Sequence, residues 1–397
     1  MPVPYKHPLE IPKSTLIAGF RWTGTRTACP IDGIHNDTHP MTWADDDEIY
    51  MSAGDPNFAY FDGKPRHVPW AEAFDKPELY PHVGGLDIEK LTGYGAAFGI
   101  EQINTMPGLM GPGGNGPKPS GMISVGGSLY LAAQNLLGKK PAPHREKSQH
   151  GSDATILRSD DHGRTWYPDI QTGLAEMEAQ LYDRRGWKWR TLPEERTSWR
   201  GWKPMFPGPA FGGPTFVQYG RDNADAVDGY VYAVSGDQWD NGSELRLGRV
   251  PQESILEVEA WEWALVRQDG SVEWTGKLEE SKPVLTIEGH LGLPEMIYVP
   301  GIKCYLLLTW GLHKDFDVKE GSELTILESE HPWGPFRLVC YEETWDSIEV
   351  CPYCPRVPIK WFDPDSLSGW IIHSGSWHTV HHYKPHVRPF QLVEESS

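Results

Sequence analysis

The sequence has no long apolar run and is poor in basic residues. No stretch reaches the roughly 18 consecutive apolar residues that a membrane-spanning helix requires. The 397 residues include 36 Lys and Arg against 55 Asp and Glu, which makes the formal net charge −19. A negative field of this size repels nucleic-acid phosphates and anionic lipid surfaces. We therefore expect neither nucleic acid nor a membrane as a partner.

Cysteine is also scarce, and the chain has five: Cys29, Cys304, Cys340, Cys351 and Cys354. An odd and sparse set argues against a small disulfide-stapled module. Cys351 and Cys354 have the spacing of half a zinc site, with Cys304 and Cys340 as further ligands. Those two lie in strand-like segments, where buried thiols are ordinary core residues. We therefore expect no metal ligands.

The first residues, MPVPYKHPLE, lack the basic start and apolar core of a signal peptide. Two localisations stay open: a cytoplasmic protein, or a secreted or periplasmic one expressed without its leader. The sequence does not predict the oligomeric state.

Long helices have little room, because 42 Gly and 35 Pro interrupt the chain every few residues. What recurs is a short apolar strand, a tight polar turn and a strand that carries an aromatic residue. The copies lie at 41–55, 121–135, 214–238, 295–313 and 357–378. A second hairpin follows at least four of them, and two hairpins make a four-stranded propeller blade.

These repeats predict an all-β fold: one five-bladed β-propeller domain over residues 1–397, with long inter-blade loops. The innermost strands are expected to start near residues 41, 121, 214, 295 and 357. Residues 75–117 and 170–210 are expected to be insertions. The apolar run 14–22 has no hairpin of its own, so it either completes the last blade, which we favour, or lies as a peripheral strand.

The segment 159–166, SDDHGRTW, fits S-x-D-x-G-x-T-W, which resembles the Asp-box turn of sialidases and other propellers. Such a turn is structural and lies between outer strands. We therefore expect Asp161 and Trp166 to lie away from any functional site.

In a propeller, the residues just before the innermost strand of each blade and those just after the second strand of each blade converge at one end of the central axis. Two carboxylates flank the first hairpin there, Asp37 and Asp55. Paired carboxylates split their pKa values, so that one can act as a base or nucleophile and the other as an acid. Asp45, Asp46 and Asp47 form the opposite turn and are expected to be solvated and inert.

The same rule collects further polar residues at this end. The other catalytic candidates are Asp237 and Glu295. The substrate-binding candidates are His35, His39, Lys118, Asn135, His290, His313, Arg356, Trp377 and His378. The 18 Trp residues suit either packing between blades or stacking on the apolar faces of sugar rings.

The segment NDTHPMTWADDDEIYMSAGD (36–55), with GRVPQESI, VPGIKCYLL and HPWGPF further on, resembles the five-bladed propeller glycoside hydrolases. The closest likeness is to the endo-D-arabinanase family, formerly a domain of unknown function. In that family two aspartates that bracket the first hairpin are implicated in catalysis, and Asp37 and Asp55 match their positions. The resemblance implies a glycosidase that degrades an arabinan-like polysaccharide or oligosaccharide.

The leading interpretation is thus a glycoside hydrolase that uses carboxylate acid/base catalysis. A polysaccharide lyase is the main alternative, with a His or Tyr base and a Lys or Arg that neutralises a uronate. A sugar-binding propeller without catalysis is the third. No cofactor is expected; a Ca²⁺ ion in the axial channel stays open, because carbonyls and carboxylates line such channels, but no acidic loop has the regular spacing of a Ca²⁺ site.

Overall fold

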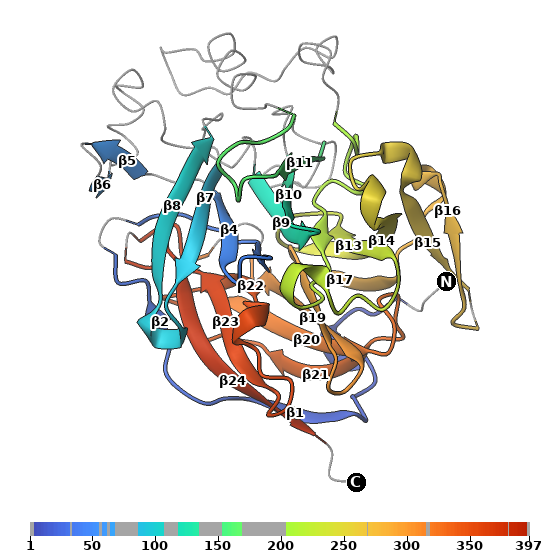
Figure 1. The fold of residues 1–397 in the computed structure, drawn as a ribbon. Coiled ribbons are helices and arrows are strands. Elements are labelled where there is room, and N and C mark those ends of the chain that lie inside the picture. The colour runs from blue at the N-terminus through green and yellow to red at the C-terminus, as the bar shows by residue number, and fades with distance from the viewer. Residues whose placement is uncertain are drawn as a thin grey trace, which may run out of the picture.

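The computed structural model describes residues 4–31, 34–54, 58–61, 64–67, 86–106, 118–134, 153–168, 204–267, 269–314, 318–379 and 381–394. Within these ranges, five antiparallel sheets surround one axis, and each sheet is a propeller blade (Figure 1). A separate two-stranded sheet is formed by β5 (Phe58–Phe61) and β6 (Lys64–His67). The predicted all-β, five-bladed fold is confirmed.

The first two blades come from the N-terminal half of the chain. Blade 1 consists of β3 (Met41–Trp43), β4 (Ile49–Gly54), β7 (Leu86–Thr92) and β8 (Gly99–Met106). Blade 2 consists of β9 (Lys118–Val125), β10 (Ser128–Gln134) and β11 (Thr155–Ser159). An isolated bridge between Arg158 and Tyr167 stands where blade 2 would have its fourth strand.

Blade 3 carries an additional hairpin on its outer side. Its strands are β12 (Thr215–Phe216), β13 (Tyr230–Gly236), β14 (Gly242–Pro251), β15 (Glu262–Val266), β16 (Val272–Thr275) and β17 (Leu285–Leu291). β14 pairs with both β15 and β17, so these two strands share the outer edge. Blade 4 is regular and consists of β18 (Glu295–Val299), β19 (Cys304–Leu312), β20 (Ser322–Ser329) and β21 (Arg337–Glu342).

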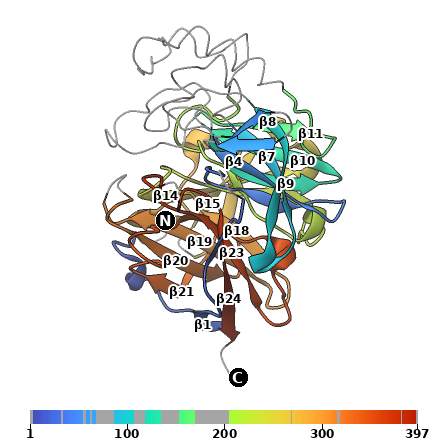
Figure 2. The same ribbon diagram turned by 90° about the vertical axis from the view of Figure 1, so that its left-hand side faces the viewer.

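Blade 5 closes the ring with both ends of the chain. It consists of β22 (Tyr353–Arg356), β23 (Ser368–Ser374), β24 (His386–Glu394) and, from the N-terminus, β1 (Ile17–Trp22), with β2 (Thr27–Ala28) also paired to β24. Phe20 lies opposite Leu392 in this pairing, and β1 lies beside the C-terminal part of β24 (Figure 2). The favoured placement of the run 14–22, as the strand that completes the last blade, is confirmed.

Apolar side chains of neighbouring blades pack against one another to form the core. Ile123 of blade 2 lies in one cluster with Val231 of blade 3. Met51 of blade 1 lies in another with Val387 of blade 5. Because strands such as β4 are buried on both faces, they do not alternate between apolar and polar residues. No helix in the described part of the chain is long and apolar enough to cross a bilayer.

Two expectations about the chain path were wrong. Much of the supposed insertion at 75–117 consists of β7 and β8, the outer strands of blade 1. β7 is buried on both faces at its start and so lacks the period-2 pattern of a half-exposed strand. The innermost strand of blade 5 begins at Tyr353, not near residue 357, where the chain enters a 3-10 helix at Ile359–Trp361.

Candidate active site

Arg356, at the end of β22, connects four blades at the axis. Its guanidinium is fully buried and donates to Glu295 Oε2 at 2.9 Å. The same group donates to the backbone carbonyls of Thr38 at 3.0 Å, Pro294 at 2.8 Å and Ser120 at 3.2 Å. These carbonyls belong to the entrances of the innermost strands of blades 1, 4 and 2. The strand entrances therefore meet at one end of the axis, as the topology rule predicts.

Glu295 is the first residue of β18, and its side chain is almost completely buried. Burial raises the pKa of Glu295 to about 7, although Arg356 and the backbone at Val357 favour the ionised form. Oε1 of this carboxyl has no hydrogen-bond partner within the described residues. A carboxyl with a pKa near neutrality can hold a proton and release it during a reaction.

Asp37 lies beside the end of β4 and is 3% exposed. Its backbone N–H donates to the Gly54 carbonyl at 3.0 Å, and the Gly54 N–H donates to the Asp37 carbonyl at 2.8 Å. The Tyr353 hydroxyl, from β22, donates to Asp37 Oδ2 at 3.3 Å. Two blades therefore position this carboxylate, blade 1 through the backbone and blade 5 through a phenol.

Lys118 joins the same cluster as the first residue of β9, where it is fully buried. The Cys354 thiol lies within electrostatic range of three of these groups, Arg356, Lys118 and Asp37. Burial raises its pKa, Arg356 and Lys118 lower it, and Asp37 raises it further. Asp37, Lys118, Glu295 and Arg356 thus come together, and we call them the axial cluster.

Four aromatic rings lie next to the axial cluster. Trp239, Trp310, Tyr353 and Trp377 are connected by ring-centroid distances of 5.0 Å for Trp239–Trp310 and 5.4 Å for Tyr353–Trp377. Trp239 is also 5.5 Å from Tyr353. Only Trp377 among them is partly exposed. The rule that residues near the ends of second strands converge on the axis could have found Trp239 and Trp310. Tyr353 was missed because the start of the innermost strand of blade 5 was expected too late in the sequence.

The remaining candidates lie in other surroundings. Asp237 caps a turn, because its Oδ1 accepts from the backbone N–H groups of Ser243 at 2.8 Å and Glu244 at 3.1 Å. His290 pairs with Glu323, and His313 contacts the carbonyls of Glu320 and Glu343 through its two ring nitrogens.

Four further candidates complete the set. His378 is exposed next to Trp377, and His35 is buried in the segment before Asp37. Asp55 and Asn135 lie outside the described residues, so the pairing of Asp55 with Asp37 stays a prediction.

His39 is buried near Asp37, and its ring is fully engaged by protein groups. Nε2 lies 2.9 Å from Asn36 Oδ1, and Nδ1 lies 3.2 Å from Ser374 Oγ. Burial, together with the charge of the nearby Arg356, lowers the pKa of His39 to about 3. The ring is therefore neutral at physiological pH.

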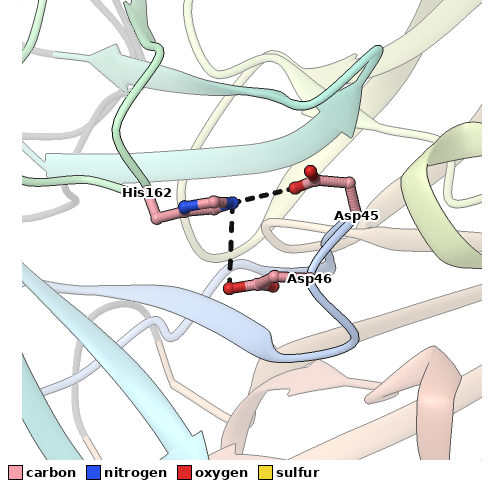
Figure 3. A group of neighbouring side chains, drawn as sticks. All are labelled: Asp45, Asp46 and His162. Atoms are coloured by element: carbon pink, nitrogen blue, oxygen red, sulfur yellow. Dashed lines mark hydrogen bonds and ion pairs between the residues drawn. The ribbon is translucent and has the colours of Figure 1, made fainter.

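One group of potential metal ligands occurs among the described residues, and it involves the turn opposite to Asp37. His162 Nε2 lies 2.8 Å from Asp45 Oδ1 and 3.7 Å from Asp46 Oδ2 (Figure 3). All three already have protein partners, since the Tyr50 hydroxyl also donates to Asp46. The three Asp residues of this turn are exposed, as expected, but they make contacts: Asp47 accepts from Trp43 Nε1 and pairs with Lys360.

No family model matches the sequence, and no curated protein matches it. Solved structures of similar shape include an α-L-arabinofuranosidase from Podospora anserina in complex with cellotriose, with 10% identity over 96% of this chain and 99% of its own, at a TM-score of 0.45. The catalytic domain of a GH62 α-L-arabinofuranosidase from Coprinopsis cinerea aligns with 10% identity over 96% of this chain and 100% of its own, at 0.46. A GH43 enzyme from Xanthomonas citri aligns with 10% identity over 94% and 91%, at 0.44. At such identities and scores the five-bladed assignment rests on this chain's own sheets.

Proposed function

We propose that the protein is a glycoside hydrolase whose reaction takes place at the axial cluster, with Glu295 as general acid and Asp37 as general base or nucleophile. The observation that carries this proposal is the buried Glu295 carboxyl, whose pKa of about 7 suits protonation of a leaving glycosidic oxygen. Asp37 supplies a second carboxylate, and glycoside cleavage uses two.

The surrounding groups support this assignment. Arg356 limits how far burial raises the pKa of Glu295 and therefore keeps the acid within reach of neutral pH. Trp377, which packs 5.4 Å from Tyr353, offers an indole at the edge of the cluster. Indole faces suit the C–H faces of sugar rings. The sequence resemblance makes arabinan the first substrate to test.

The lyase alternative finds less support in these contacts. It needs a His or Tyr base, but the His39 imidazole is a weak base, because its pKa is lowered to about 3 and both of its ring nitrogens are engaged. It also needs a cation for the uronate, and because the Arg356 guanidinium is committed to Glu295 and three backbone carbonyls, Lys118 is the other cation of the axial cluster that would have to serve. Both alternatives, lyase and binding module, are outcomes of the experiment below.

The test is digestion of arabinan and of a uronate-containing polysaccharide, with reducing ends and near-ultraviolet absorbance recorded together. We expect new reducing ends without absorbance, because hydrolysis forms no unsaturated product. Glu295→Gln and Asp37→Asn should each lower turnover about 10²-fold or more. Asp55→Asn tests the carboxylate that directly follows Gly54. Products that absorb would establish the lyase, and binding without turnover would establish the sugar-binding module.

A further inference from the structure

The turn that follows Asp37 has an unusual backbone. Thr38 has φ of 69° and His39 has φ of 42°, and both residues are fully buried. Left-handed φ values are uncommon for residues other than glycine, and a β-branched residue such as Thr is a clear outlier there. Such conformations persist only where the surroundings impose them, and they cluster at functional sites.

Four side chains impose this conformation, and we call them the turn clamp: Asn36, His39, Glu89 and Ser374. Asn36 Nδ2 donates to Glu89 Oε1 at 3.0 Å, and His39 Nε2 lies 2.9 Å from Asn36 Oδ1. Ser374 Oγ lies 3.2 Å from His39 Nδ1 and accepts from the Thr38 N–H at 3.0 Å. The clamp thus connects β7 of blade 1 with the end of β23 of blade 5.

The direction of each hydrogen bond follows from the neutral state of His39. A neutral imidazole donates through one nitrogen and accepts through the other. Since Asn36 uses its amide nitrogen on Glu89, its oxygen accepts from His39 Nε2–H. Nδ1 then accepts the Ser374 hydroxyl hydrogen, and the Ser374 oxygen remains free to accept the Thr38 N–H. Each member of the clamp therefore depends on the next.

The clamp acts on both chain neighbours of Asp37, the Asn36 side chain and the Thr38 peptide. Arg356 Nε adds a hydrogen bond to the Thr38 carbonyl at 3.0 Å. We propose that Asn36, His39, Glu89 and Ser374 are positioning residues that hold the left-handed turn and thereby set the direction of the Asp37 carboxylate. The proposal rests on the proposed function, in which Asp37 reacts.

Two substitutions that break the clamp test this, each with a matched partner. Ser374→Ala removes the hydroxyl that contacts both His39 and Thr38. Glu89→Met removes the acceptor for Asn36, whereas Glu89→Gln keeps it. Burial, followed by the charge of Asp87, raises the pKa of Glu89 well above its usual value, so a neutral Gln is a close mimic. Ser124→Ala is the control, because it also removes a buried hydroxyl. Ser124 lies at the end of β9 far from Lys118, and its hydroxyl donates a hydrogen bond to Asp222.

We expect Ser374→Ala and Glu89→Met to lower kcat on arabinan by about tenfold to a hundredfold, since small misplacements of a reacting group cost this much. KM should change less than about twofold, because ground-state binding is retained. Glu89→Gln and Ser124→Ala should keep kcat within about twofold. In an Asp37→Asn background Ser374→Ala should lower kcat no further, because the residue whose position it controls no longer reacts.

The outcomes separate the two proposals. If Asp37→Asn keeps full turnover, the proposed function fails. If Asp37→Asn is inactive while Ser374→Ala and Glu89→Met keep full kcat, the positioning role alone fails. An equal loss from Ser374→Ala in both backgrounds also overturns it. A check that needs no substrate is the crystal structure of Ser374→Ala, where we expect the Thr38 φ to leave the left-handed region; an unmoved turn and carboxylate would contradict the proposal.

Discussion

Glu295 and Arg356 form a buried ion pair on the propeller axis, with 2.9 Å between Oε2 and Nη1. The glutamate comes from the first residue of β18 and the arginine from the last residue of β22. Blade 4 and blade 5 therefore share one charge pair at the end of the axis where the strand entrances meet. Glu295 is the proposed general acid, and the first two predictions concern this pair.

The first prediction concerns the pH dependence of turnover. A general acid must be protonated, and burial raises the pKa of Glu295 to about 7. Turnover should therefore fall as the pH rises through about 7, and Glu295→Gln should remove this alkaline limb along with most of the activity. Initial rates on arabinan between pH 4 and 9 measure it. An unchanged alkaline limb in Glu295→Gln would show that another group sets it.

The same titration affects stability. The folded state binds the Glu295 proton more tightly than the unfolded chain, where the pKa is 4.5. The contribution of Glu295 to the free energy of unfolding should therefore be largest below about pH 4.5 and fall toward pH 7, by about 1.4 kcal/mol per pH unit at most. Urea unfolding of the wild type and Glu295→Gln at several pH values measures the difference, which should become flat above pH 7.

The second prediction concerns Arg356. Arg356→Met removes the donor of the Glu295 carboxylate and of the Thr38 and Pro294 carbonyls, whereas the Ser120 carbonyl still accepts from the Thr215 hydroxyl at 3.0 Å. We expect a loss of about 3–5 kcal/mol in the free energy of unfolding, the usual cost of breaking a buried ion pair. Arg356→Lys keeps the charge but cannot reach all four acceptors, so it should also be destabilising.

The control for Arg356 is Lys277, whose exposed amine pairs with Glu280 at 2.9 Å. Lys277→Met should cause no measurable change, because solvent screens exposed pairs. Equal stability of Arg356→Met and the wild type in urea unfolding would rule out a structural role for the axial guanidinium.

The third prediction concerns Gly54. A Cβ at this position would stand 2.7 Å from Asp37 Oδ1 and 3.2 Å from Pro119 Cδ. Because the Asp37 carboxylate is the more movable neighbour, Gly54→Ala should displace it and lower turnover about tenfold or more, with a smaller loss of stability. Gly229→Ala is the matched control, since nothing lies within 4 Å of its added Cβ. Equal turnover of the two variants would argue against Asp37 as a reacting group.

The fourth prediction concerns the turn at 159–166. The Asp161 carboxylate accepts from the Thr165 N–H at 2.8 Å, the Thr165 hydroxyl at 2.6 Å and the Ser159 hydroxyl at 2.8 Å. Trp166 packs in the same turn and donates to the Gly163 carbonyl at 2.9 Å. Asp161→Ala should lower the melting temperature and leave turnover unchanged at a temperature where the variant is folded. Loss of activity in a stable variant would place Asp161 in the reaction.

The sequence alone determined the five repeats and much of the axial cluster. Short apolar strands, tight polar turns and second strands that carry an aromatic residue mark the hairpins, because Asp, Gly and Pro are the residues that tight turns require. In a propeller, the start of the innermost strand of every blade necessarily lies at the central axis. Asp37, Lys118 and Glu295 follow from that rule, and Arg356 lies at the axis although its strand starts earlier than expected.

Only the tertiary structure decided which of these polar groups act together. Asp237 and His290 satisfy the same sequence rule, yet one caps a turn and the other pairs with Glu323. Glu89 lies in the third strand of blade 1, and the rule covers only the first two strands of each blade. Its carboxylate accepts a hydrogen bond from Asn36, 53 residues away in the sequence. Hydrogen bonds of this kind depend on strand register and side-chain direction across blades. A local sequence pattern contains neither, because both are set when the ring closes and brings residues of the first and last blades together.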